Sequence, residues 1–420
     1  MKTRAVMLHG ADDVRLEEFE LPEIKDDELL VKVISDSICM STYKAIRQGA
    51  KHKRVPDNVS ERPVMVGHEF EGIIVKVGKK WQERYHEGQR FAVQPTLNYK
   101  GTLWAPGYSY PYYGGACTYC VVPHEAVEMN CILPYSGESF FDASLCEPLS
   151  CVIGGFNSNY HTNRQNYQHS MGTKEGGNIL ILGGCGPMGL GAISYSLAMK
   201  NKPARVVVTE VSDDRLDRAR KLLSPEDAKK KGIELIYVNT ASSQDPESDL
   251  MKLTDGHGYD DVFLFVPIRS VAEMGNHLLA FDGCMNIFAG PMDHKFSAEI
   301  NLYDAHYTST HVMGASGGLP MDTEEVISLM EEGKILPAVM VTHIGGLDSY
   351  ADTVLHLPEI RGGKKLVYTQ INMPMTAISD FREKGKTDPF YAELADACDR
   401  HNGLWNAEAE KILFRHFGIQ

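Results

Sequence analysis

The sequence predicts an α/β protein that combines a small β-rich domain with a doubly wound parallel sheet. Two observations support this fold class. Short β-type runs separated by glycine, proline and charged residues fill roughly the first 150 residues. From about residue 177, continuous apolar runs alternate with helical patterns, and such runs are typical of parallel strands buried on both faces. The length of 420 residues also favours two domains over one core.

The β-rich part is a series of short strands. The first follows directly from the start of the chain, since "MKTRAVMLHG" has no apolar segment of signal-peptide length, and we expect no leader. Four further runs predict strands, and no long helical period interrupts them. These runs are "LLVKVISDSICM" (29–40), "EFEGIIVKVGKKW" (69–81), "GQRFAVQPT" (88–96) and "YCVVPHEAV" (119–127).

The second part alternates strands and helices. Strands are predicted at "GNILILGG" (177–184), "ARVVVTEV" (204–211), "ELIYVNT" (234–240), "DDVFLFVP" (260–267) and "GCMNIFAG" (283–290). Helices are predicted at "MGLGAISYSLAMK" (188–200), "DDRLDRARKLL" (213–223) and "VAEMGNHLLA" (271–280).

After about residue 316 the chain is expected to return to the first domain. A helix at 321–335 leads to strands at 339–346 and 364–370, and a further helix is predicted at 390–401. The domains are therefore predicted as 1–155 with 316–420, and 156–315. The last ~50 residues form an extension for which the sequence suggests no function.

Composition excludes several classes of protein. The hydrophobic share of 43% and charged share of 23% are near the globular norm, which argues against disorder. A net charge of −14 disfavours broad phosphate neutralisation, so no nucleic-acid partner is expected. No apolar run reaches the ~18 residues of a membrane span, and no membrane partner is expected. Nine scattered cysteines fit reduced thiols in a cytoplasmic protein.

A glycine loop predicts a Rossmann-type dinucleotide site. "LILGGCGPMGLGA" places Gly184, Gly186 and Gly189 in a G-x-G-x-x-G between a buried strand and a helix, and the next strand ends at Glu210. Gly184 is expected to permit the tight turn, Gly186 to let the backbone approach the pyrophosphate, and Gly189 to pack helix on strand. Glu210 favours NAD over NADP, although the nearby Arg215 weakens that preference. The alternative is a glycine-rich turn without a ligand.

Four scattered side chains could form a metal site. Cys39 follows a predicted strand, His68 and Glu69 lie between glycines, and Glu147 lies in "SLCEPLSC". A thiolate, an imidazole and one or two carboxylates can hold zinc tetrahedrally with one position left for water or substrate. On spacing alone, structural roles for these residues are equally acceptable.

The motifs resemble a known family. "GHEFEGIIVKVG" resembles the G-H-E-x-x-G signature of zinc-containing medium-chain alcohol dehydrogenases, and "GCGPMG" is similar to their cofactor loop, which adds Pro187 and Met188 to the expected cofactor contacts. "CEPLSC" resembles the E-P-L-S segment of the sorbitol dehydrogenase branch. Further segments, "GYSYP", "EPLSCVIG", "HVMGASGG" and "GGKKLVYT", are similar to a bacterial sugar-phosphate reductase of that branch.

The resemblance implies a GroES-like catalytic domain and a role for each site residue. Cys39, His68 and Glu69 would be zinc ligands, and Glu147 would ligate directly or through water. Ser41 matches the family's proton-relay hydroxyl. Glu69 or Glu147 would exchange with water as substrate arrives. Thr42 replaces the usual Asp, which puts support of the zinc-bound histidine in doubt.

The implied reaction is hydride transfer between a nicotinamide cofactor and a sugar phosphate. The expected pair is L-sorbose 1-phosphate and D-glucitol 6-phosphate, with one catalytic zinc ion, no structural zinc, and NAD rather than NADP. Free polyols are the alternative substrates, and a non-catalytic NAD-sensing relative is the alternative class. The family also implies a homo-oligomer, dimeric or tetrameric.

A basic segment lies between the Cys39 and His68 motifs. "QGAKHKRVPDN" contains Lys51, His52, Lys53 and Arg54, the most concentrated positive stretch of an acidic chain. A solvated loop is the ordinary interpretation. Resemblance to a sugar-phosphate reductase favours a phosphate clamp, with Lys44 as a further candidate.

Two other features leave alternatives open. The stretch "LWAPGYSYPYYGG" (103–115) is rich in aromatic residues and could line a substrate pocket or pack a domain surface. Cys117 and Cys120 form a Cys-x-x-Cys, but on a continuous strand residues three apart point to opposite faces. We therefore expect two ordinary thiols that do not converge.

Overall fold

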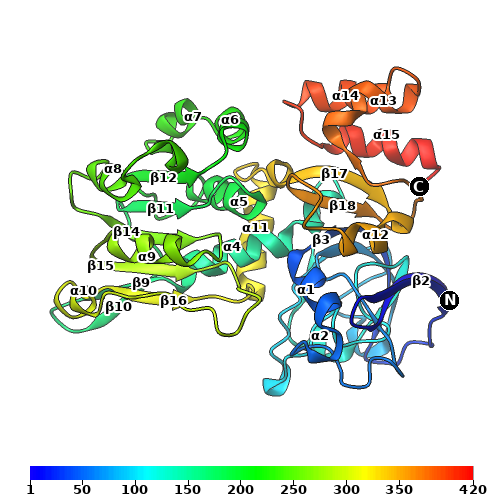
Figure 1. The fold of residues 1–420 in the computed structure, drawn as a ribbon. Coiled ribbons are helices and arrows are strands. Elements are labelled where there is room, and N and C mark those ends of the chain that lie inside the picture. Colours follow the sequence, from blue (N-terminus) through cyan, green and yellow to red (C-terminus); the bar gives the residue numbers. More distant parts are fainter. Residues whose placement is uncertain (420) are drawn as a thin grey trace. The chain divides into compact units, whose positions relative to one another are not determined.

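The computed structural model describes residues 1–419 and divides them into two compact units. Unit 1 comprises 1–148, 319–332 and 340–419, and unit 2 comprises 149–318 and 333–339. Figure 1 shows the strands and helices of each. One boundary falls within helix α4 (Cys146–Ser158), close to its N-terminus. The sequence-based boundaries were 155 and 316.

Unit 1 is built around an eight-stranded sheet. Seven strands follow the order β19-β17-β18-β3-β5-β6-β8, and β7 pairs with the remaining part of β3. Their bounds are β3 (Leu29–Ile38), β5 (Phe70–Val77), β6 (Arg90–Val93), β7 (Tyr119–Val122), β8 (Ile132–Pro134), β17 (Val341–Gly346), β18 (Lys364–Tyr368) and β19 (Thr376–Ala377). The strands at 341–346 and 364–368 thus belong to the same sheet as β3.

A smaller sheet and several helices also belong to unit 1. The sheet has the order β2-β1-β4, with β1 (Lys2–Gly10), β2 (Asp13–Glu20) and β4 (Val64–Met65). The helices are α1 (Met40–Gln48), α2 (His124–Glu128), α3 (Phe141–Ser144), α11 (Pro320–Glu331) and α12 (Tyr350–Leu355). The strand predicted at 119–127 is therefore wrong after Val122, because Pro123 precedes a short helix.

Three neighbouring strands bring one end of the sheet to a common point. In the register, Lys365 pairs with Ile38 and Asp36 pairs with Phe70, so the end of β3 lies beside the starts of β18 and β5. Residues just outside these ends, at 39, 68–69 and 364, are consequently close in space. This edge holds the candidate site.

Unit 2 contains a six-stranded parallel sheet in the order β13-β12-β11-β14-β15-β16. The strands are β11 (Asn178–Leu182), β12 (Arg205–Glu210), β13 (Glu234–Asn239), β14 (Tyr259–Leu264), β15 (Leu279–Ile287) and β16 (His311–Gly314). The helices are α5 (Pro187–Ser196), α6 (Asp213–Leu222), α7 (Pro225–Lys230), α8 (Pro246–Lys252), α9 (Arg269–His277) and α10 (Leu302–Tyr307). Every residue of β14 is buried, as expected of a central parallel strand.

Some elements had no clear sequence signal. The hairpin of β9 (Tyr160–Asn163) and β10 (Gln168–Met171) is polar, and all four residues of β10 are exposed. Helix α4 begins at the motif containing Glu147. The predicted fold class is confirmed, with a β-rich first unit and a Rossmann-type parallel sheet.

The C-terminal extension folds onto unit 1. It contains α13 (Phe381–Lys384), α14 (Pro389–Arg400) and α15 (Ala407–Phe417), drawn in orange to red in Figure 1. Trp405 is fully buried, and its indole N–H donates to the Tyr368 hydroxyl of β18 at 2.7 Å. Glu410 accepts from the same hydroxyl at 2.7 Å and from the backbone N–H groups of Phe140 and Phe141 at 2.8 and 2.9 Å. The extension is therefore an integral part of the core of unit 1.

Candidate metal centre and cofactor loop

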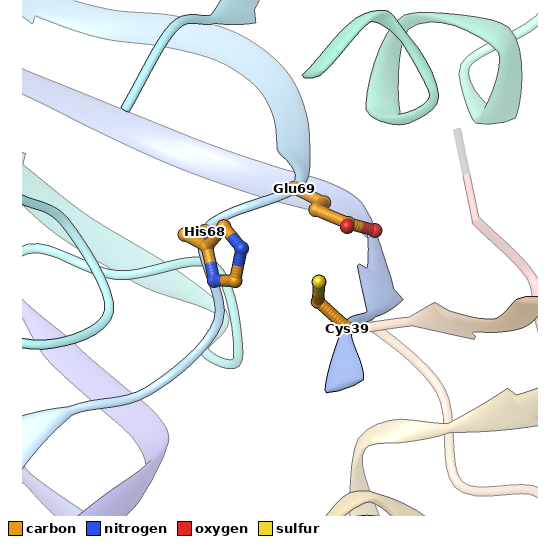
Figure 2. Close-up of side chains that lie close together, drawn as sticks. All are labelled: Cys39, His68 and Glu69. Carbon is orange, nitrogen blue, oxygen red and sulfur yellow. The ribbon is translucent and has the colours of Figure 1, made fainter. Parts of the chain in front are cut away.

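Cys39, His68 and Glu69 converge on one point (Figure 2). One ligand atom from each lies within 4.8 Å of the others, and among residues 1–419 no other group of three His, Cys, Asp or Glu side chains meets this criterion. Cys39 is the N-cap of α1, directly after β3, and the His68–Glu69 pair directly precedes β5. The ends of two paired strands thus bring together residues that are 29 positions apart in the chain.

The imidazole of His68 is oriented by Thr42. The Thr42 hydroxyl lies 3.2 Å from Nδ1 of His68, and both side chains are buried. A hydroxyl that accepts from Nδ1–H leaves Nε2 unprotonated and available to a metal. The sequence left it in doubt whether Thr42, which replaces the usual Asp, supports this histidine. In the structure the Thr42 hydroxyl lies within hydrogen-bond distance of its Nδ1.

Ser41 lies at the centre of the hydrogen bonds around the cluster. Its Oγ donates to the Cys39 sulfur at 3.0 Å and lies 3.2 Å from Nε2 of His68. It also accepts a hydrogen bond from the Tyr108 hydroxyl at 2.9 Å. Tyr108 belongs to the aromatic stretch whose role the sequence left open, and that part of the stretch contacts the cluster directly.

Glu69 is paired with a buried lysine that sequence reasoning missed. Both carboxylate oxygens accept from Nζ of Lys364, and one also accepts from the Ser37 hydroxyl. Although burial opposes ionisation, Lys364, His68 and Ser37 together hold the pKa of Glu69 below its usual value. The only sequence signal was a lysine at the start of an apolar strand, where an unpaired charge would be costly.

Glu147 lies near the cluster but outside its 4.8 Å group. It occupies the first turn of α4 and is buried. Burial, reinforced by the negative charge of Glu69, raises the pKa of Glu147 to about 8. The two carboxylates therefore differ, since one is held ionised by a lysine and the other favours its protonated form.

The donor set fits zinc. Zinc binds thiolate sulfur at ~2.3 Å and imidazole nitrogen at ~2.0–2.1 Å, and takes carboxylate oxygen as a third ligand. Donor atoms within 4.8 Å of one another can reach this geometry with small side-chain shifts. Burial raises the pKa of Cys39 to about 11, and a cation at this point would supply the positive charge that a thiolate needs.

The glycine loop of unit 2 has the geometry of a dinucleotide turn. A Cβ at Gly189 would lie 2.2 Å from the carbonyl oxygen of Gly184, whereas a Cβ at Gly186 would meet nothing within 4 Å. Gly189 is thus closely packed against Gly184, and the space beside Gly186 is open. The turn itself depends on Gly183, which has φ +71°, whereas Gly184 packs against Ile181 and Val208. The expectation that Gly184 permits the tight turn was therefore wrong.

The loop leads directly into the start of α5. Gly186 is the N-cap, Pro187 is the first helical residue, and Gly186, Pro187 and Met188 are all partly exposed. The free N–H groups of this ten-residue helix face the loop, which suits a pyrophosphate. Glu210 ends β12, and its side chain is buried while Arg215 lies 3.7 Å away. Arg215 thus partly offsets the charge of Glu210.

The basic segment is attached to the metal cluster through Tyr108. The Tyr108 ring stacks on His52 at 5.5 Å, and the Arg54 guanidinium lies 5.4 Å from its centroid. Nε of Arg54 is buried with no hydrogen-bond partner among residues 1–419. Burial and the neighbouring cations lower the pKa of His52 to about 4, so His52 stacks as a neutral ring.

The lysines of the candidate clamp differ in position. Lys51 and Lys53 are exposed. Lys44 lies in α1, where burial lowers its pKa and the nearby Cys39 opposes that effect.

Cys117 and Cys120 do not diverge as expected. The chain is not a continuous strand between them, because β7 begins at Tyr119 and Cys117 forms an isolated bridge with Ala5. Both thiols are fully buried, and burial together with a hydrogen bond that the Cys117 thiol donates to Cys120 raises the pKa of Cys117 well above its usual value. The periodicity argument was therefore wrong, although no third potential metal ligand joins the pair within residues 1–419.

The fold and the donor set define a class of protein, and comparison with known families identifies it. Residues 25–130 match the alcohol dehydrogenase GroES-like domain, and residues 187–332 match the zinc-binding dehydrogenase model. The chain therefore belongs to the zinc-dependent, NAD(P)-linked medium-chain alcohol and polyol dehydrogenases. Zinc and NAD(P) are the cofactors typical of this family.

Three relatives are similar over nearly the whole chain. The protein YggP of Escherichia coli (strain K12) is 51% identical, with 100% of this chain and 98% of the relative covered. Mannitol-1-phosphate 5-dehydrogenase of Aliivibrio fischeri is 46% identical, with 100% and 99% covered. L-sorbose 1-phosphate reductase of Klebsiella pneumoniae is 45% identical, with 99% and 98% covered.

A solved structure shares the fold. That of 2R,3R-butanediol dehydrogenase from Bacillus subtilis matches with a TM-score of 0.71 at 23% identity, covering 87% of this chain and 99% of the other. Within residues 1–419, no helix has both the length and the apolar character needed to cross a bilayer.

Proposed function

We propose that the protein interconverts a hexitol phosphate and a ketose phosphate by hydride transfer with NAD at a single catalytic zinc ion. The observation that supports this most directly is the contact of Tyr108 with both the Cys39–His68–Glu69 cluster and the basic segment 51–54. A metal site and an anion site would then be close enough for one small substrate molecule to contact both.

Cys39, His68 and Glu69 would hold the metal, with Glu147 as the further carboxylate. Bound zinc would act as a Lewis acid that stabilises negative charge on the reacting oxygen. The substrate alcohol gives a hydride to the nicotinamide and its hydroxyl proton to solvent, which yields a ketone and reduced cofactor. Ser41 would accept that hydroxyl proton first, a role supported by its partial exposure and its hydrogen bond to Cys39.

Several residues of unit 2 would bind the cofactor. Gly186 and the N-terminus of α5, with Gly184, Pro187, Met188 and Gly189, would take the pyrophosphate. Glu210 would accept the ribose hydroxyls, which favours NAD because a 2′-phosphate would meet a carboxylate. Arg215 would reduce this preference without reversing it, since it lies 3.7 Å from Glu210 and is exposed.

The substrate class rests on the basic segment and the relatives. Two relatives at 45–46% identity carry names of sugar-phosphate enzymes. Arg54 has a buried, unpartnered Nε and can bind phosphate in a bidentate manner. Lys53, and Lys44 from α1, would add charge. The expected pair remains L-sorbose 1-phosphate and D-glucitol 6-phosphate.

One experiment tests the substrate class. NADH oxidation is measured across a panel that contains L-sorbose 1-phosphate, fructose 6-phosphate and the corresponding free ketoses. We expect kcat/KM to be at least 100-fold higher for a phosphorylated ketose. Equal values for the free sugars would instead support a polyol dehydrogenase, and no turnover with NAD binding retained would support a sensing relative. Charge reversal at Lys53 and Arg54 is expected to raise KM for phosphorylated substrates only. The proposed homo-oligomeric state is tested by sedimentation equilibrium.

A further inference from the structure

Tyr108 is the point at which the basic segment and the metal cluster meet. Its side chain is only 1% exposed. Its hydroxyl donates to Ser41 at 2.9 Å and lies 3.4 Å from Nε2 of His68. Its ring packs against His68, at 5.0 Å between centroids, and against His52 at 5.5 Å. One residue therefore contacts both parts of the proposed active site.

The backbone holds Tyr108 in this place. The preceding Gly107 has φ +76°, and a Cβ there would lie 2.3 Å from the carbonyl oxygen of Gly67, which directly precedes His68. The following Ser109 donates from its hydroxyl to the carbonyl oxygen of Arg54 at 2.8 Å. The segment is thus pressed against the histidine on one side and tied to the basic segment on the other.

The Tyr108 hydroxyl restricts the direction of the Ser41 hydroxyl. A serine hydroxyl has one donor and two acceptor sites. Ser41 uses its donor toward Cys39 at 3.0 Å and one acceptor for Tyr108. One acceptor site remains, and it is the site that a substrate proton needs. Without Tyr108, both acceptor sites of Ser41 would be open, and the direction of its hydroxyl would be less restricted.

We propose that Tyr108 is a positioning residue with two separable roles: its hydroxyl aims Ser41 for proton transfer, and its ring holds the basic segment where that segment binds the substrate anion. This proposal rests on the proposed function. It adds a specific residue to it, because Tyr108 would place phosphate binding and proton transfer in a fixed relation.

Two variants separate these roles. Tyr108→Phe keeps the ring and removes the hydroxyl, so we expect kcat for hexitol phosphate oxidation to fall roughly tenfold while KM changes less than twofold. The loss should shrink as the pH rises, because hydroxide can then take the proton directly. Tyr108→Leu also removes the ring and should in addition raise KM and weaken binding of inorganic phosphate roughly tenfold, as measured by calorimetry.

A matched control lies five residues away. Tyr113 is equally buried, and its hydroxyl has no hydrogen-bond partner among residues 1–419. Tyr113→Phe should therefore leave kcat, KM and phosphate affinity unchanged. The visible spectrum of cobalt-substituted Tyr108→Phe should match that of the wild type, which shows that the metal site is intact.

Three outcomes would overturn the proposal: a kcat for Tyr108→Phe within twofold of wild type, a loss that is independent of pH, or an altered cobalt spectrum. The last would mean that Tyr108 only supports the structure of the metal site. Failure of the proposed function is distinguishable, because wild-type protein would then oxidise no hexitol phosphate. The effect of Tyr108→Leu on phosphate affinity would still decide the role of the ring.

Discussion

Lys364 and Glu69 form a buried ion pair at the edge of the metal cluster. Their side chains are 5% and 1% exposed, and the lysine nitrogen contacts both carboxylate oxygens. Glu69 raises the pKa of Lys364 against the effect of its burial. A charged carboxylate is thus available where the other ligands converge. The same carboxylate would have to loosen its contact with Lys364 in order to ligate a metal.

Removal of the lysine should destabilise the protein strongly. Lys364→Met leaves a buried carboxylate without its counter-charge, so metal-free protein should lose about 3–5 kcal/mol of unfolding free energy. Urea unfolding measures this loss. The double variant Lys364→Met/Glu69→Gln should regain most of it, because neither charge then remains. A double variant no more stable than Lys364→Met would show that the pair does not act as a unit.

Metal content should depend on Cys39 and His68. Cys39→Ser and His68→Ala should each lower bound zinc at least tenfold and abolish turnover, because the ligands that remain cannot retain the ion at micromolar concentration. Elemental analysis after gel filtration measures this. Cys117→Ser and Cys120→Ser are matched controls and should keep the metal. If either control variant lost zinc, Cys117 and Cys120 would also be metal ligands.

Glu210 should determine cofactor choice. Glu210→Ala removes the proposed acceptor of the ribose hydroxyls, and KM for NAD should rise roughly tenfold, in line with ~1.5 kcal/mol for a charged hydrogen bond. KM for NADP should fall in the same variant, because the repulsion of its 2′-phosphate is gone. Steady-state kinetics with both cofactors provides the measurement. An unchanged preference for NAD over NADP would mean that residues other than Glu210 distinguish the two cofactors.

Glu410 should make stability depend on pH. Burial raises the pKa of this carboxyl to about 7 in the folded protein, from 4.5. A raised carboxyl pKa means that the unfolded chain releases its proton first, so stability decreases as the pH rises from 4.5 toward 7. The advantage of Glu410→Gln over wild type should therefore grow across this range, by up to about 3 kcal/mol.

Unfolding at several pH values tests this dependence. Glu408 provides the control, because it lies on the same helix but is exposed and pairs with Arg400. Glu408→Gln should show the same pH dependence as wild type. If the stability of Glu410→Gln changed with pH in the same way as that of wild type, Glu410 would not be the group that causes the pH dependence.

The repeating elements of this fold could be read from the sequence because their signal is local. The strand 178–182, the helix 187–196 and the strand 205–210 follow apolar periodicity and glycine punctuation. The short helix 124–128 and the hairpin 160–171 were not predicted, since neither shows a clear hydrophobic periodicity. The candidate ligands Cys39, His68 and Glu69 were identified through motifs rather than through their positions in space.

The sequence by itself determined the class of fold, the dinucleotide loop and the set of candidate ligands, since each was identified from short motifs whose residues are close together in the chain. Only the tertiary structure determined which residues contact these candidate ligands and Ser41. Lys364 is 295 positions from Glu69, and Tyr108 is 67 positions from Ser41. The structure also brought Cys117 and Cys120 together. Such contacts depend on strand register and on where each strand ends, and no local pattern encodes them.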